Sequence, residues 1–133
     1  MSANKKRVLV IDDDLELQQL VRILLSRQNM EVMTADTVAS GVRALATPPL
    51  PDIVLLDLML PDESGIDFLK QVRARTAFDA MPIIVLSALV DPKQIKEALD
   101  AGADRYLTKP YIANNLVSYV TDVLRSGRRQ ASS

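Results

Sequence analysis

The residues of this sequence that could do chemistry stand at the ends of short apolar segments. They comprise carboxylates, a hydroxyl and an ammonium: Asp12, Asp13, Asp14, Asp57, Ser87 and Lys109. Carboxylates about 5 Å apart repel by about 3 kcal/mol per pair at an effective dielectric of about 20, so such a cluster needs cations. Lysine supplies one positive charge, and Mg²⁺, which prefers carboxylate and water oxygens, supplies two. A carboxylate held between them is a plausible nucleophile toward phosphorus.

Composition narrows the chemistry further. The chain has 133 residues, a length typical of one domain, and a net charge of −1, so no global charge draws it to nucleic acid or anionic lipid. The absence of Cys and His excludes thiolate and Ser-His-Asp catalysis as well as zinc-thiolate sites. No segment approaches the roughly 20 apolar residues of a membrane span. We therefore expect a soluble, cytoplasmic protein with no membrane partner.

The elements that must position these residues alternate between two hydrophobic patterns. Five short segments are strand candidates: Arg7–Ile11, Met30–Ala35, Asp52–Asp57, Pro82–Ser87 and Asp104–Leu107. The first, third and fourth of these are continuous apolar runs, which are typical of strands buried on both faces. Apolar stripes of helical spacing follow each of them. Asp36 or Thr37 could cap the second helix, and Asp91-Pro92 opens the fourth, which ends at Gly102. The pattern predicts an α/β domain with a doubly wound parallel sheet, whose ligands lie at the carboxyl ends of the strands.

Each of these polar residues has an ordinary structural interpretation when it is taken alone. Asp14 is expected to cap a helix, Asp57 could be a turn residue, and Ser87 and Lys109 could simply face solvent. The fold, however, gathers the ends of neighbouring strands at one edge of the sheet. One mechanism needs all of these residue types together, which favours a functional site.

At this point the sequence resembles the response-regulator receiver domain of two-component signalling, over Lys5 to Arg125. The matching motifs occur in order along the chain: VLVIDD at 8–13, DIVLLDLMLPD at 52–62 with Gly65, PIIVLSA at 82–88, GAD at 102–104 and YLTKPY at 106–111. The resemblance implies a flavodoxin-like (βα)5 fold with strand order 2-1-3-4-5. It implies a receiver domain over 4–126, with 127–133 as a flexible tail or the start of a linker to an absent output domain.

The resemblance also implies a role for each site residue. Asp57 is expected to be the phosphoacceptor. Mg²⁺ is expected to bind Asp12, Asp13, Asp57 and the backbone carbonyl of Met59. Lys109 and Ser87 are expected to contact the phosphoryl group as the catalytic residues.

Further roles concern the switch and the lifetime of the phosphorylated state. Ser87 and Tyr106 are expected to form the switch, and the Lys109–Pro110 bond is expected to be cis. Apolar Met59 and Leu89 stand two residues beyond Asp57 and Ser87, and we expect them to shield the acyl phosphate from water. The domain is expected to catalyse only its own phosphorylation and dephosphorylation, and so not to be an enzyme in the usual sense.

The implied function is phosphorelay signal transduction. A sensor histidine kinase or phosphotransfer protein would supply the phosphoryl group, and the face made by the fourth helix, fifth strand and fifth helix would control an output. A homodimer through that face is an option, and this domain is expected not to bind nucleic acid directly. The fifth helix has no Arg before Arg125, which weakens the assignment to winged-helix transcription factors.

Two alternatives remain open at this stage. One is a receiver-like adaptor that works without phosphate. The other is a phosphohydrolase of the haloacid dehalogenase type, whose D-x-D pattern Asp12 and Asp14 match formally. That family needs a second acidic motif after its lysine, and nothing acidic follows Lys109 before Asp122.

Overall fold

The structure, a computed structural model, describes residues 5–88, 91–109 and 112–128. Its strands are β1 (Lys6–Ile11), β2 (Met30–Ala35), β3 (Ile53–Asp57), β4 (Ile83–Ser87) and β5 (Arg105–Thr108). Its helices are α1 (Leu15–Ser26), α2 (Val38–Ala46), α3 (Gly65–Arg73), the 3₁₀ turn η1 (Thr76–Phe78), α4 (Pro92–Asp100) and α5 (Ile112–Ser126). The predicted alternation of strand and helix is confirmed, and no strand end differs from its predicted position by more than one residue.

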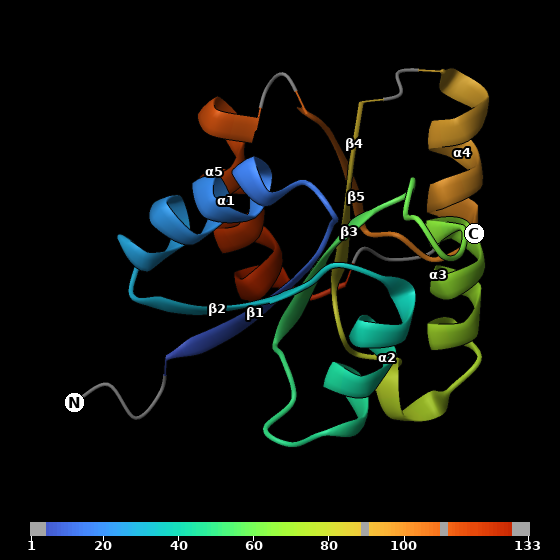
Figure 1. Cartoon of the computed structure of the whole chain (residues 1–133), viewed down its shortest axis with the longest axis horizontal. Helices are drawn as coiled ribbons and strands as arrows, with labels where there is room; N and C mark the ends of the chain where they lie inside the picture. The colour runs from blue at the N-terminus through green and yellow to red at the C-terminus, as the bar shows by residue number, and fades with distance from the viewer. Residues whose placement is uncertain (1–4, 89–90, 110–111, 129–133) are drawn as a thin grey trace.

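The strands form one parallel sheet in the order β2-β1-β3-β4-β5. Helices α1 and α5 cover one face of this sheet, and α2, α3 and α4 cover the other (Figure 1). This is the predicted doubly wound α/β fold with strand order 2-1-3-4-5. From β1 the chain first adds β2 on one side of the sheet and then β3, β4 and β5 on the other side. The switch point between β1 and β3 is where such folds bind their ligands.

Alternate residues of the central strands belong to different cores. In β1, Leu9 and Ile11 pack under α2 and α3, whereas Val8 and Val10 pack under α1 and α5. Because both faces are covered, these strands are apolar throughout and show no alternation of polar and apolar residues. The four central strand residues from Val8 to Ile11 are fully buried. This packing fixes the position of the carboxyl end of each strand.

Short polar side chains cap four of the helices, among them Ser64 at the start of α3, as their N-cap preference predicts. Asp14 accepts hydrogen bonds from the amides of Glu16 and Leu17 at the start of α1. Thr37, rather than Asp36, caps α2, and Asp91 precedes Pro92 at the start of α4. None of the described helices is long and apolar enough to span a membrane.

An ion cluster holds the end of the described chain against the sheet. The Asp104 carboxylate is fully buried, and it accepts hydrogen bonds from Arg73 at 3.1 Å and from Arg128 at 3.0 Å. Arg128 also donates to the backbone carbonyls of Asp79 and Gly102. The chain that leaves α5 is therefore fixed beside the amino ends of β4 and β5.

The packing predicts a large effect for a central core truncation. Leu55 is fully buried in β3, so Leu55→Ala should lower the free energy of unfolding by about 2–5 kcal/mol through lost burial and the cavity that remains. The measurement is urea unfolding followed by circular dichroism. Ile23→Ala, on the exposed side of α1, is the control and should change stability by less than about 1 kcal/mol. Equal effects of the two variants would contradict the described core.

Candidate functional site

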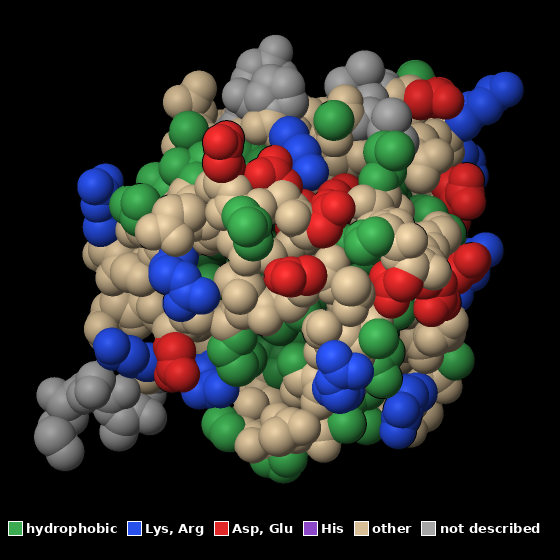
Figure 2. Space-filling view, viewed as in Figure 1, with side chains coloured by type: hydrophobic (Ala, Val, Ile, Leu, Met, Phe, Trp, Pro, Cys, Tyr) green, Lys and Arg blue, Asp and Glu red, His purple; other side chains and the backbone are tan. Residues whose placement is uncertain are grey.

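The acidic residues singled out from the sequence meet at the carboxyl ends of neighbouring strands. Asp12 and Asp13 follow β1, and Asp57 ends β3. One carboxylate oxygen from each of the three lies within 4.8 Å of the others. Figure 2 shows acidic side chains gathered in the upper half of the view. The strands run toward this side of the molecule in Figure 1, which is drawn in the same orientation. The predicted acid cluster is therefore formed.

Lys109, which follows β5, reaches into this cluster. Its Nζ lies 3.3 Å from Asp12 Oδ2 and 3.3 Å from Asp57 Oδ2. Burial lowers the pKa of Lys109, but attraction to Asp12 and Asp57 outweighs it and leaves that pKa raised. The ammonium therefore stays charged and draws two carboxylates together.

Asp12 is a buried carboxyl of the cluster whose pKa is raised. Its side chain is fully buried. Burial, helped by repulsion from Asp57, raises its pKa from 3.8 to about 6 against the opposing effects of the Asp14 amide and Lys109. Oδ1 accepts a hydrogen bond from the Asp14 amide at 2.9 Å. Oδ2 forms an ion pair with Lys109 that lacks hydrogen-bond geometry. No donor among the described residues forms a hydrogen bond to this oxygen.

The cluster has the chemistry of a site for a hard divalent cation. Three carboxylates and one ammonium leave two uncompensated negative charges when all are ionised, and one buried oxygen of Asp12 lacks a donor. Oxygen ligands that are mainly carboxylates suit Mg²⁺ or Ca²⁺. Asp13 is exposed, so the site is open to solvent on that side.

The turn between β1 and α1 is held by a residue that the sequence analysis missed. Gln18 is buried on α1, and its Nε2 donates to the backbone carbonyl of Asp12 at 2.5 Å and to Asp36 Oδ1 at 3.0 Å. From its position on α1, Gln18 thus fixes the backbone of the acid pair. The signal was present, because Gln18 is a polar residue beside the apolar stripe of Leu17 and Val21.

The loop between β3 and α3 is shaped around Asp57. The Met59 amide donates to Asp57 Oδ1 at 3.1 Å. Gly65 approaches so closely that a Cβ there would lie 2.5 Å from the Asp57 carbonyl oxygen. Side chains larger than hydrogen are therefore excluded at position 65 unless the backbone after Asp57 moves.

Asp62, on the same loop, is a second residue that the sequence analysis did not single out. Its two carboxylate oxygens accept the amides of Val38 at 3.0 Å and Ala39 at 3.1 Å, at the start of α2. These hydrogen bonds, the Val38 amide first, lower the pKa of Asp62. Asp62 therefore ties the loop that carries Met59 to the neighbouring helix.

The remaining site residues lie around the cluster at different depths. Ser87 is fully buried at the end of β4, and Tyr106 is half-buried in β5 against the core under α4. The Met59 side chain is 63% exposed. Pro110, with the expected cis bond before it, and Leu89 lie outside the described residues.

The sequence profile of the response regulator receiver domain matches residues 8–121. This chain belongs to the response regulator receiver family. The order of motifs, the fold and the acid cluster agree with that assignment.

Several curated relatives of this receiver domain are transcriptional regulators. It is 49% identical over 104 residues to the transcriptional regulatory protein KdpE of Mycobacterium tuberculosis, a match covering 78% of this chain and 44% of that protein. It is 32% identical over 120 residues to the phosphate regulon regulator PhoB of Escherichia coli, covering 90% and 52%. The chain thus spans about half the length of the curated relatives that it matches.

Solved structures show the same fold for receiver domains. A CheY-like receiver domain protein from Methanospirillum hungatei has a TM-score of 0.82 and 26% identity, covering 92% of this chain and 95% of that one. The BeF3-activated receiver domain of RstA from Klebsiella pneumoniae has a TM-score of 0.83 and 26% identity, covering 91% and 100%. These similarities confirm the receiver fold.

The raised pKa of Asp12 predicts how stability depends on pH. A carboxyl whose folded pKa lies above its ordinary value loses stabilisation as pH rises from 3.8 through about 6. With a chelator present, Asp12→Asn should therefore raise the free energy of unfolding at pH 7 by up to about 3 kcal/mol. The gain should vanish near pH 4, as measured by urea unfolding at both pH values. Asp122→Asn, an exposed control, should show neither effect, and an Asp12→Asn gain independent of pH would contradict the electrostatic account.

Proposed function

We propose that this domain accepts a phosphoryl group on Asp57 from a phosphohistidine of a sensor histidine kinase or phosphotransfer protein. The observation that carries the proposal is the placement of Asp57 beside both Lys109 and the acid pair. The carboxylate is buried, with 3% of its surface exposed, yet one oxygen lies 3.3 Å from Lys109 and the other receives the Met59 amide. Family membership supports this assignment.

The proposed step transfers one phosphoryl group between two proteins. An oxygen of the Asp57 carboxylate forms a bond to phosphorus while the bond from phosphorus to the donor imidazole nitrogen breaks. The imidazole leaves with the electron pair of that bond and the product is an acyl phosphate on Asp57. Charge develops on the phosphoryl oxygens, and Lys109 is close enough to neutralise part of it.

We assign the metal in this reaction as Mg²⁺. Asp12, Asp13 and Asp57, with the backbone carbonyl of Met59, would hold it, and the unsatisfied Oδ2 of Asp12 supports this choice. The ion would supply positive charge to the phosphoryl oxygens opposite Lys109. The carboxylates alone would repel an incoming phosphoryl group.

The proposed switch links the acceptor to the face made by α4, β5 and α5. Ser87 pairs with Thr108 in the β4–β5 register, and Tyr106 lies two residues earlier on β5. A phosphoryl group on Asp57 adds acceptor oxygens that the Ser87 hydroxyl and Lys109 can bond. That bond would bias the ends of β4 and β5 toward a second arrangement, with Tyr106 moving inward as the hydroxyl leaves its path.

The wider assignments rest on the family alone. We propose that residues 4–126 act as the receiver unit, that the segment 127–133 is a tail or linker, and that the phosphorylated α4-β5-α5 face controls an output, either directly or through a homodimer. The domain itself contacts proteins rather than nucleic acid, works in the cytoplasm, and catalyses only its own phosphorylation and dephosphorylation.

The first test is phosphorylation by a small phosphodonor. Incubation with acetyl phosphate and Mg²⁺ should add one phosphoryl group, about 80 Da by intact mass. Asp57→Asn should abolish the gain because the amide is not a nucleophile toward phosphorus, and a chelator should abolish it in the original protein. Asp67→Asn, on the exposed side of α3, is the control and should be phosphorylated normally. A gain that survives in Asp57→Asn would contradict the assignment of the acceptor.

The second test concerns the lifetime of the acyl phosphate. We propose that the apolar Met59 side chain, directly beyond the acceptor strand, keeps attacking water from the phosphoryl group. Met59→Asn should therefore speed the loss of phosphate severalfold, followed by mass after removal of the phosphodonor. Leu50→Asn changes another exposed apolar residue, which precedes the amino end of β3 and so lies away from Asp57, and it should leave the decay rate unchanged. An unchanged or slower decay in Met59→Asn would show that Met59 has no shielding role.

A further inference from the structure

A pocket lies between α2 and α3, apart from the acid cluster. Its volume is about 180 Å³, and its walls come from the second half of α2, the middle and end of α3, and η1. Helices that connect parallel strands run opposite to those strands, so the ends of α2 and α3 lie near the amino edge of the sheet. Asp57 lies at the carboxyl edge, and the pocket is therefore a separate site.

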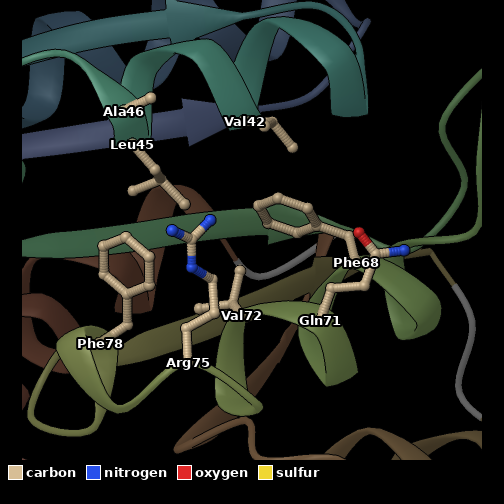
Figure 3. Close-up of a pocket in the computed structure, with 8 residues that line it drawn as sticks. All are labelled: Val42, Leu45, Ala46, Phe68, Gln71, Val72, Arg75 and Phe78. Carbon is tan, nitrogen blue, oxygen red and sulfur yellow. The ribbon is translucent and has the colours of Figure 1, made fainter.

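The walls of the pocket are mostly apolar. Figure 3 shows Leu45 directed into the space from α2, with Phe68 and Phe78 on either side of it. Val42, at the rim, is 43% exposed. An apolar cavity of about 150 Å³ is large enough to hold benzene. The space therefore matches one aromatic ring.

One cation, the exposed side chain of Arg75, lies at the rim of this apolar space. Figure 3 shows the Arg75 guanidinium between Phe68 and Phe78, and its Cζ lies 5.8 Å from the centroid of the Phe78 ring. No carboxylate lines the pocket, and within the described part of the chain Arg75 has no acidic partner. Arg7 and Arg73, by contrast, pair with Glu31 and Asp104.

We propose that this pocket binds a small aromatic carboxylate, with the ring against Leu45, Phe68 and Phe78 and the carboxylate on Arg75. A guanidinium presents paired donors that match the two oxygens of a carboxylate. The apolar walls exclude water from the ring, while Arg75 at the exposed rim pairs with the carboxylate. A protein partner would need about 1,000 Å² of interface, whereas the concave surface has the size of one ring. The proposal is independent of phosphoryl transfer at Asp57.

The test is a titration of the whole chain with phenylacetate, followed by the amide signals in a ¹⁵N NMR spectrum. Saturable shifts are expected in residues 42–46 and 68–78. The neutral analogue 2-phenylethanol should bind the same residues more weakly, because it fills the apolar space without pairing with Arg75. Absence of saturation by about 10 mM phenylacetate, or shifts confined to other surfaces, would overturn the proposal.

Two variants separate the contributions of charge and shape. Arg75→Gln should weaken phenylacetate binding about tenfold while changing 2-phenylethanol binding less than about twofold. Arg43→Gln removes an exposed arginine on α2 that does not line the pocket, and it should leave both ligands unaffected. Ala46→Phe should fill the pocket and abolish binding of both. Phenylacetate affinity that is unchanged in Arg75→Gln, or retained in Ala46→Phe, would contradict the assigned site.

Discussion

The close approach of three carboxylates to one lysine is the constraint on which the rest of the structure depends. At separations of about 5 Å each like-charged pair is unfavourable by about 3 kcal/mol, and Lys109 compensates only part of this with its two contacts of 3.3 Å. Burial raises the pKa of Asp12 to about 6, and repulsion from Asp57 adds to that effect. The cluster persists because the sheet holds the ends of β1, β3 and β5 in place, and the free energy for this comes from the two apolar cores.

The groups around the cluster orient the carboxylates without neutralising them. Amides of Asp14 and Met59 each satisfy one carboxylate oxygen, and Gln18 holds the backbone of Asp12. All three are uncharged donors, so the site keeps its affinity for a cation. Gly65 lets α3 begin against the backbone of Asp57, which leaves the acceptor side chain little freedom to turn away. Orientation and charge are thus controlled by different parts of the chain.

The sequence predicted the features that depend on local pattern and on strand ends. Buried strands read as continuous apolar runs, and Asp14 and Asp91 were predicted as caps because capping is local. The contacts of Gln18 and Asp62 join segments 18 to 24 residues apart in sequence, and no local pattern identifies the partners of these side chains. The pocket at Arg75 was not predicted for the same reason, because in the sequence its residues are typical of ordinary helix positions. The lack of arginine before Arg125 in the fifth helix argued against winged-helix transcription factors, yet the curated relatives include the transcriptional regulators KdpE and PhoB.

The Arg128 contacts have a mechanical consequence. Helix α5 has 15 residues and is about 22 Å long, and a helix that is pulled at its carboxyl end usually unwinds from its last turn. Here Arg128 is hydrogen-bonded to Asp104, just before β5, and to two carbonyls at the same corner. Tension applied at residue 128 would therefore act first on the segments that precede β4 and β5, and it would reach α5 only after the Arg128 contacts had broken.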